Sequence, residues 1–328
     1  MKALVLGGSG LIGNAIVRSL IARRYRVTVV SRRATPPPNL VDVEVRFVSG
    51  SVDEHDKLDE WIAAHDVVVD AAAPYALNLF HSVPDAKARP LEHARLRTEA
   101  LLSSAMRHDV RLAYVGALSK RRPRTTNGLE AWQSRFMQRL QPYFEIKETI
   151  ERLYALASRH GLRTVVVKPS ACFGPWDIKP REQCWVPALL SGEIPVTLQH
   201  RLNVVDTRDV ANTLVSALES ESYGSAIPVT GHNTSVSDLC CLLCELAGVV
   251  SPKWSVPAAL GVLPTLWAEL AWGVVGRPSP LPSLIPMLLC EQEWTATDPS
   301  QTKLGCAPRA LSATASDAIA WYRSIGYC

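Results

Sequence analysis

Residues 2–13 read KALVLGGSGLIG, an apolar run that passes directly into a turn rich in glycine. The run Lys2–Leu6 predicts a strand. Apolar residues at helical spacing then predict a helix over residues 14–24, and a second apolar strand is expected at residues 27–30. Together these segments predict a strand–helix–strand unit with the glycine turn at its first corner.

In this context the glycines predict a dinucleotide-binding site. One glycine permits the tight turn, one lets the backbone approach a pyrophosphate, and one lets the helix pack closely on the strand. The pyrophosphate would lie against unpaired N–H groups at the start of the helix. The candidate cofactor-binding residues of the turn are Gly7, Ser9, Gly10, Leu11, Ile12 and Gly13.

Arg32 and Arg33 follow the second strand, where an NAD site usually carries an acidic residue for the ribose 2′-hydroxyl. A guanidinium can donate two parallel hydrogen bonds to a phosphate, which suits the 2′-phosphate of NADP(H). We therefore expect NADP(H) as the cofactor, bound in part by Arg32 and Arg33. The alternative is that both arginines begin a solvated loop before Pro36–Pro38.

Composition narrows the class of protein. With 328 residues, of which 47% are hydrophobic, the chain can bury a substantial core and form two domains. A formal net charge of +4 without a long basic stripe argues against nucleic-acid binding. The eight cysteines and eight histidines lack metal-site spacing, so we expect no metal. With no secretory signal visible, we expect a cytoplasmic protein.

Strand and helix patterns alternate through the first half of the chain. Further strands are expected at residues 43–48, 66–71, 111–115 and 164–168, and helices at residues 57–64, 91–107 and 144–159. This alternation predicts an α/β fold with a Rossmann-type, doubly wound parallel sheet. We expect a dinucleotide-binding domain over residues 1–170 and a smaller substrate-binding domain over residues 171–328. A strand near residues 226–231 should return to the first domain, so that the two interleave.

Residues 256–276 are markedly apolar. Their length approaches a membrane span, but Pro257, Pro264 and Glu269 interrupt the run, and we expect no transmembrane helix. Two interpretations stay open. We favour a buried helix pair that lines an apolar pocket, and the alternative is peripheral contact with a membrane.

Tyr143 and Lys147 stand four residues apart in a segment with a helical pattern. On a helix such a pair shares one face, about 6 Å apart along the axis. An ammonium beside a phenol favours the phenolate and lowers the pKa of the phenol, which is about 10 without such a neighbour. Tyr143 is therefore the candidate proton donor to a carbonyl oxygen, or the base in the reverse direction, with Lys147 as its partner.

At this point the chain resembles the short-chain dehydrogenase/reductase superfamily, in the extended branch that holds dihydroflavonol-reductase-like enzymes and the NAD-dependent epimerases and dehydratases. The three-glycine turn and the Tyr143–Lys147 pair match that branch. Further matches follow in the expected order, namely Ala71–Ala73, KPSACFGP at 168–175, NVVDTRDVA at 203–211, and the C-terminal stretches 304–309 and 321–327. The stretch 203–211 resembles the strand and helix start of the family's substrate domain.

The resemblance implies roles for further residues. Lys147 would also hold the nicotinamide ribose. Other cofactor contacts would come from Ser51, Ala72, Ala73, Lys168, Pro169 and Ala171. A serine near the end of the fifth strand would donate a hydrogen bond to the substrate oxygen, but its usual positions hold Gly116 and Ala117. Ser119 is therefore the catalytic candidate, with Thr125 and Thr126 as alternatives.

A basic cluster of Lys120, Arg121, Arg122 and Arg124 follows Ser119. An acidic substrate or carrier could dock there, although we favour a solvated loop. Dimers through paired helices are common in the family, so a homodimer is a further expectation.

Three functions fit these residues. The leading one is an NADP(H)-dependent reductase of a ketone, or similarly polarised double bond, in an apolar or aromatic small molecule, with Tyr143 as proton donor. The second is a nucleotide-sugar epimerase or dehydratase with tightly bound NAD, for which Arg181, Arg201 and Arg208 are available to a second diphosphate. The third is an inactive NADP(H)-binding sensor or assembly factor on the same fold.

Overall fold

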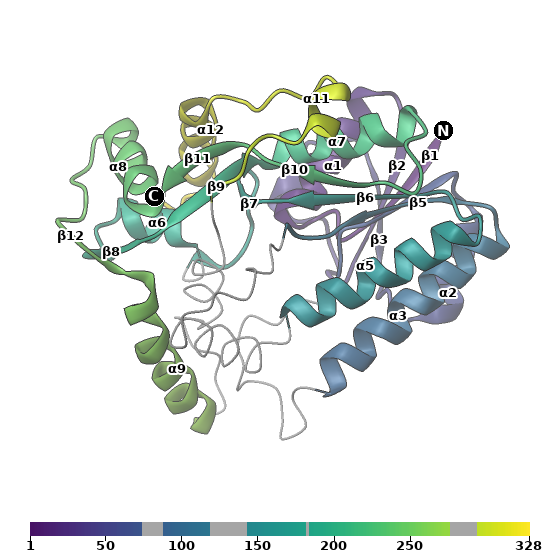
Figure 1. Cartoon of the computed structure of the whole chain (residues 1–328), viewed down its shortest axis with the longest axis horizontal. Coiled ribbons are helices and arrows are strands. Elements are labelled where there is room, and N and C mark those ends of the chain that lie inside the picture. The colour runs from purple at the N-terminus through teal and green to yellow at the C-terminus, as the bar shows by residue number, and fades with distance from the viewer. Residues whose placement is uncertain (74–87, 119–142, 182–183, 276–293) are drawn as a thin grey trace.

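The computed structural model describes residues 1–73, 88–118, 143–181, 184–275 and 294–328 (Figure 1). A seven-stranded parallel sheet forms the centre, in the order β10-β6-β5-β4-β1-β2-β3. Its strands are β1 (Lys2–Leu6), β2 (Arg26–Ser31), β3 (Arg46–Ser49), β4 (Val67–Asp70), β5 (Arg111–Val115), β6 (Thr164–Pro169) and β10 (Ala226–Val229). The predicted Rossmann-type parallel sheet is confirmed.

Helices cover both faces of this sheet. α1 (Leu11–Ala22) and α7 (Thr207–Glu219) lie on one face, and α2 (His55–Ala63), α3 (Ala88–Arg107) and α5 (Tyr143–Arg159) lie on the other (Figure 1). Successive side chains of a strand point to opposite faces. Ala3 and Val5 accordingly join the core under α1, while Leu4 and Leu6 join the core under α3 and α5. Burial on both faces explains why these strands are continuous apolar runs.

Smaller sheets lie beside the carboxyl ends of the central strands. One has the order β11-β9-β7 and consists of β7 (Ala171–Phe173), β9 (Arg201–Asp206) and β11 (His232–Ser235). The other pairs β8 (Val196–Gln199) with β12 (Trp254–Pro257). The accompanying helices are α6 (Trp185–Leu190), α8 (Val236–Ala247), α9 (Ala258–Val274) and α12 (Leu311–Ser324), whereas η1 (Pro38–Leu40) follows β2 and α11 (Pro299–Lys303) contacts β10 of the large sheet.

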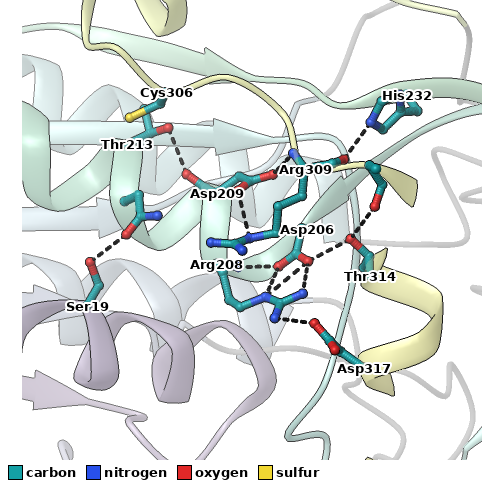
Figure 2. A network of polar contacts seen from close by, with 12 residues as sticks. Ser19, Asp206, Arg208, Asp209, Thr213, His232, Cys306, Arg309, Thr314 and Asp317 are labelled. Carbon is teal, nitrogen blue, oxygen red and sulfur yellow. Dashed lines mark hydrogen bonds and ion pairs between the residues drawn. The ribbon is translucent and has the colours of Figure 1, made fainter. Parts of the chain in front are cut away.

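A polar network fastens the C-terminal segment to the start of α7 (Figure 2). Asp206 caps α7 by accepting a hydrogen bond from the Arg208 N–H at 2.7 Å, and it pairs with the Arg208 guanidinium at 2.6 Å. Thr314 of α12 donates to the same carboxylate at 2.7 Å, and Arg208 reaches on to Asp317 at 2.6 Å. Because α7 packs on α1, this network also sets the position of the small sheet against the large one.

Two expected boundaries move, for local reasons. α1 begins at Leu11 instead of residue 14, because Gly10 in extended backbone conformation is the helix N-cap. The strand expected at residues 43–48 is β3 (Arg46–Ser49), whose ladder with β2 starts at Arg46 opposite Thr28. The strand expected near residues 226–231 does return to the main sheet, as β10 beside β6.

The stretch 203–211, which resembles the strand and helix start of the family's substrate domain, divides between the two sheets. β9 belongs to the small sheet, but α7 packs on α1 over the central sheet. The reason is the apolar face of α7, on which Val210 and Leu214 are completely buried in the core under α1.

The expectation of a buried helix pair at residues 256–276 is wrong for the part of the stretch that the structure describes. That part contains one helix, α9, on which Leu260, Leu263, Trp267 and Val274 are 63–83% exposed. Nearly every residue of α9 is apolar, so any face turned away from the body carries large apolar side chains. Within the described ranges, no helix has both the length and the apolarity to cross a bilayer.

We expect Asp206→Ala to lower the free energy of unfolding by about 3 kcal/mol, because it leaves the nearly buried Arg208 without its main partner and removes the α7 cap. Asp317→Ala is the matched control. Its carboxylate is half exposed, so its loss should cost less than about 1 kcal/mol. Urea unfolding measures both, and equal losses would contradict this account.

The same substitution should change the pH dependence of stability. Burial alone would raise the pKa of Asp206, but the hydrogen bonds from Arg208 and Thr314 outweigh it and hold the pKa below its ordinary value. A carboxyl group with a lowered pKa stabilises the fold above about pH 4 and loses that contribution as the pH falls. Acid should therefore destabilise the wild-type protein more steeply than Asp206→Ala.

Candidate active site

The turn after β1 runs so close to its surroundings that it requires glycine. Gly7 has φ +78°, and a Cβ atom there would lie 2.8 Å from the Ala71 carbonyl oxygen and 2.9 Å from the Ala72 Cβ. A Cβ atom on Gly13 would lie 2.2 Å from the Gly7 carbonyl oxygen. Because these glycines have no side chain, the start of α1 packs closely against its own turn and against the end of β4.

The start of α1 is built for an anion. Gly10 is its N-cap and provides no side-chain hydrogen bond, and the first turn contains no acidic residue. A Cβ atom on Gly10 would have one close neighbour, the Gly7 carbonyl oxygen at 3.3 Å, so this side of the turn is less crowded than the sides at Gly7 and Gly13. The N–H groups of Leu11, Ile12 and Gly13 therefore fit the pyrophosphate of a dinucleotide.

The candidates for the adenosine half lie next to this turn. Arg32 and Arg33 are exposed directly after β2. The Ser9 hydroxyl is 3.3 Å from the Ser31 hydroxyl, and the Gly50 N–H donates to the Ser31 carbonyl oxygen at 2.9 Å. Ser51, which follows Gly50, therefore lies beside the two arginines at the carboxyl edge of the sheet.

Tyr143 is the first residue of α5, and Lys147 lies one turn further along the helix. The Lys147 ammonium nitrogen lies 6.0 Å from the centre of the Tyr143 ring and 5.3 Å from that of Tyr114. It donates a hydrogen bond to the Val115 carbonyl oxygen at 3.3 Å. Burial lowers the pKa of Lys147 to about 8, against the opposing effect of the Asp70 and Glu151 carboxylates. The predicted tyrosine and lysine are thus brought together at the end of β5.

Sequence reasoning missed two carboxylates behind this pair. Asp70, the last residue of β4, forms a buried ion pair with Arg97 of α3. Glu151, one turn after Lys147, forms an ion pair with Lys168 of β6 at 2.8 Å. Two features of the sequence could have indicated these carboxylates. One is the aspartate that ends the apolar run VVVD, and the other is the glutamate eight residues after Tyr143 on the same helix face.

The position of the missing serine has a structural explanation. A Cβ atom on Gly116 would lie 2.8 Å from a Glu151 carboxylate oxygen, so Glu151 takes the space that a side chain at residue 116 would need. Ser119, the catalytic candidate, lies outside the described residues. So do its alternatives Thr125 and Thr126 and the basic cluster at residues 120–124.

The remaining cofactor candidates lie at the carboxyl ends of β4 and β6. Ala72 and Ala73 follow β4, and Ala72 adjoins Gly7. Pro169 ends β6 and Ala171 begins β7, at the point where the chain passes from the large sheet to the small one. Lys168 directs its ammonium to Glu151.

The three arginines considered for a second diphosphate all have partners. Arg208 holds Asp206 and Asp317, and Arg181 pairs with Glu193 at 2.6 Å. The Arg201 guanidinium carbon lies 4.6 Å from the centre of a Trp294 ring. Among the described residues, no group of three or more His, Cys, Asp or Glu side chains is arranged to hold a metal.

The comparisons with known proteins agree with this geometry. The model of the NAD dependent epimerase/dehydratase family matches residues 3–227, which is more than half of the chain. The chain therefore belongs to this family of extended short-chain dehydrogenases/reductases, which bind a nicotinamide dinucleotide. It is an oxidoreductase or epimerase that depends on NAD or NADP.

Relatives are similar over nearly their whole length. The "Sterol demethylase protein B" of Methylococcus capsulatus is 25% identical, with 99% of both chains covered. The "2-alkyl-3-oxoalkanoate reductase" of Stenotrophomonas maltophilia is also 25% identical, with 94% of this chain and 95% of the relative covered. A nucleoside-diphosphate-sugar epimerase from Pseudomonas aeruginosa has the same fold, with TM-score 0.73, 23% identity, and coverage of 100% of this chain and 99% of that one.

Substitutions in the glycine turn should separate folding from dinucleotide binding. Gly13→Ala forces a Cβ atom into the Gly7 carbonyl group, so we expect both a lower melting temperature and loss of dinucleotide binding. Gly10→Ala is the matched control for folding, because φ is −76° and its Cβ atom would have one close neighbour, the Gly7 carbonyl oxygen at 3.3 Å, against 2.2 Å for Gly13→Ala. It should melt close to the wild type yet bind NADPH at least roughly 10-fold more weakly, since its methyl group projects toward the pyrophosphate. Unchanged affinity in Gly10→Ala would contradict this site.

Proposed function

We propose that this protein is an NADP(H)-dependent reductase of a ketone, or similarly polarised double bond, in an apolar or aromatic small molecule. The observation that carries the proposal is the buried Lys147 ammonium beside Tyr143, at the carboxyl edge of the sheet that also presents the glycine turn. A charged amine held out of solvent next to a phenol is an arrangement for moving a proton.

The chain's own residues account for the proton. A reduced nicotinamide dinucleotide at the glycine turn would supply the hydride. Tyr143 donates its hydroxyl proton to the carbonyl oxygen, and Lys147 stabilises the phenolate that remains. Ser119 orients the carbonyl oxygen by a hydrogen bond. Because the pKa of Lys147 is about 8, its ammonium is charged at neutral pH.

The preference for NADP(H) rests on Arg32 and Arg33. Both are exposed where β2 ends, and the strand ends in the uncharged Ser31, where an NAD site usually carries an acidic residue. Residues 32 and 33 lie next to Ser51 across the Ser31–Gly50 hydrogen bond, which completes the proposed adenosine pocket.

Cofactor choice can be tested by tryptophan fluorescence titration with NADPH and NADH. The wild type should bind NADPH more tightly. Arg32→Glu with Arg33→Glu should weaken NADPH binding at least roughly 10-fold, because two charge-assisted contacts become repulsive, and should change NADH binding much less. The matched control is Arg24→Glu with Arg26→Glu, two exposed residues at the other end of the strand, which should alter neither. Equal losses for both cofactors would overturn the NADP(H) assignment.

Tyr143→Phe should lower the NADPH-dependent turnover number by about 100- to 10,000-fold, the usual contribution of a positioned general acid. Its Kd for NADPH should stay within about 2-fold, because the hydroxyl is assigned to the substrate. Tyr25→Phe, remote from the site at the start of β2, is the control. Turnover that survives in Tyr143→Phe would remove this residue from the acid role.

The substrate class rests on exposed apolar side chains of α9. α9 carries exposed leucine and tryptophan side chains and lies on the side of the molecule toward which the carboxyl ends of the central strands point (Figure 1). We assign residues 171–328 to the substrate-binding part, except that α7 and β10 pack with the Rossmann sheet. The Stenotrophomonas relative is named as a reductase of 2-alkyl-3-oxoalkanoates, and such a substrate is an apolar oxo compound.

The other two functions predict different results in the same titration. Tightly retained NAD with no response to NADPH would favour the epimerase or dehydratase. Reversible NADPH binding without turnover on any carbonyl substrate would favour the inactive sensor. The partners already held by Arg181 and Arg208 weigh against a second diphosphate.

A further inference from the structure

A second charged pair lies buried directly behind the Tyr143–Lys147 pair. The Asp70 side chain is 0% exposed and the Arg97 side chain 2%. The two terminal nitrogens of Arg97 donate to separate carboxylate oxygens of Asp70, at 2.7 and 3.0 Å. A buried ion pair seldom adds stability over apolar residues of the same size, because both charges lose their hydration. Stability therefore does not explain why two charges lie here.

Tyr114 connects this pair to Lys147. Asp70 and Tyr114 are opposite each other in the β4–β5 ladder. The Lys147 ammonium lies 5.3 Å from the centre of the Tyr114 ring and bonds to the carbonyl group of the next residue, Val115. Asp70 and Lys147 thus approach the same buried ring from β4 and from α5.

The surroundings let charges act over this distance. The hydroxyl groups of Tyr114 and Tyr154 and the Nε atom of Arg97 are buried, with no hydrogen-bond partner among the described residues. The two tyrosine rings stack with their centres 4.9 Å apart. Charges in such a poorly solvated region interact more strongly than they would in water.

We propose that the Asp70–Arg97 pair is a positioning pair, which keeps the Lys147 ammonium charged beside Tyr143. The carboxylate stabilises the ammonium, and the guanidinium holds the carboxylate in place and moderates its effect. This inference rests on the proposed function, in which Tyr143 moves a proton with the help of a charged Lys147.

Within the described part of the chain, the groups that face Lys147 come from five elements. They are Asp70 from β4, Arg97 from α3, Tyr114 from β5, Tyr143 and Glu151 from α5, and Cys172 from β7. Glu151 also favours the ammonium, but Lys168 already pairs with it. Burial raises the pKa of the Cys172 thiol to about 12, so that thiol is neutral at pH 7. Asp70 is therefore the carboxylate with the largest effect, and Arg97 acts in the opposite direction.

Cyanate tests the proposal on the full chain without cofactor or substrate. The neutral amine reacts with cyanic acid, whose concentration falls as the pH rises. The labelling rate of the Lys147 peptide, read by mass spectrometry and divided by the cyanic acid concentration at each pH, therefore has a midpoint that reports where the ammonium loses its proton. Asp70→Asn should lower this midpoint by about one pH unit, since it removes a stabilising charge. Adding Arg97→Met to Asp70→Asn should move the midpoint back up, because Arg97 alone only repels the ammonium.

The outcomes are distinct. Asp59→Asn is the matched control. It removes a carboxylate that forms an ion pair with Arg107 of α3 on the surface, and it should leave the midpoint unchanged. If Asp70→Asn does not fold, the double variant Asp70→Asn with Arg97→Met tests the proposal by itself. Its midpoint should still lie below that of the wild type. A midpoint equal to the wild type in the folded variants would overturn the proposal.

Turnover separates this inference from the proposed function. In an active enzyme, the NADPH-dependent rate should fall as the pH rises. The pH at which it falls should shift from variant to variant together with the labelling midpoint. Shifted labelling midpoints in a protein with no carbonyl-reducing activity would support the positioning pair and reject the reductase. A purely structural pair would lower the rate without moving either midpoint.

Discussion

The contact between the Gly13 position and the Gly7 carbonyl group is the constraint on which the other features depend. Only a hydrogen atom fits there, so α1 starts directly above the end of β1. The same turn presses on Ala71 and Ala72, which places the end of β4 beside the open start of the helix. One close backbone approach therefore both forms the anion site and aligns the strand that carries Asp70.

The site is organised by charge in a region with little solvent. Lys147 is 8% exposed, and among the described residues its ammonium bonds to a backbone carbonyl group and not to a carboxylate. Asp70 and Glu151 each have a cation of their own, Arg97 and Lys168. Lys147 is thereby influenced by both carboxylates without being neutralised by either, which leaves its positive charge available to Tyr143.

The C-terminal part is joined to this frame by polar contacts on one side and leaves apolar surface on the other. The Asp206–Arg208–Asp317 network ties α12 to the start of α7, and α7 is itself part of the Rossmann core (Figure 2). α9 instead exposes several of its largest side chains. The C-terminal part of the molecule is thus anchored near the sheet and exposes apolar side chains on α9.

The sequence by itself determined the sheet, the dinucleotide turn and the tyrosine–lysine pair. Each of these depends on local order: apolar runs buried on both faces, glycines at positions with no room for a side chain, and two residues one helical turn apart. The departure at Gly116 was also visible in the sequence, but its cause was not, because Glu151 comes from a helix 35 residues later.

Only the tertiary structure decided what surrounds Lys147 and where the later segments pack. Asp70 and Arg97 are 27 residues apart, and nothing local indicates that β4 and α3 bring them together. Likewise, the helical pattern of α7 was plain, but its place on α1 depends on a contact between residues nearly 200 positions apart, such as Ser19 and Asn212. Periodicity shows that a helix has an apolar face, whereas the partner of that face is set by the packing of the whole chain. For α9 this packing leaves much of an almost wholly apolar surface in contact with solvent.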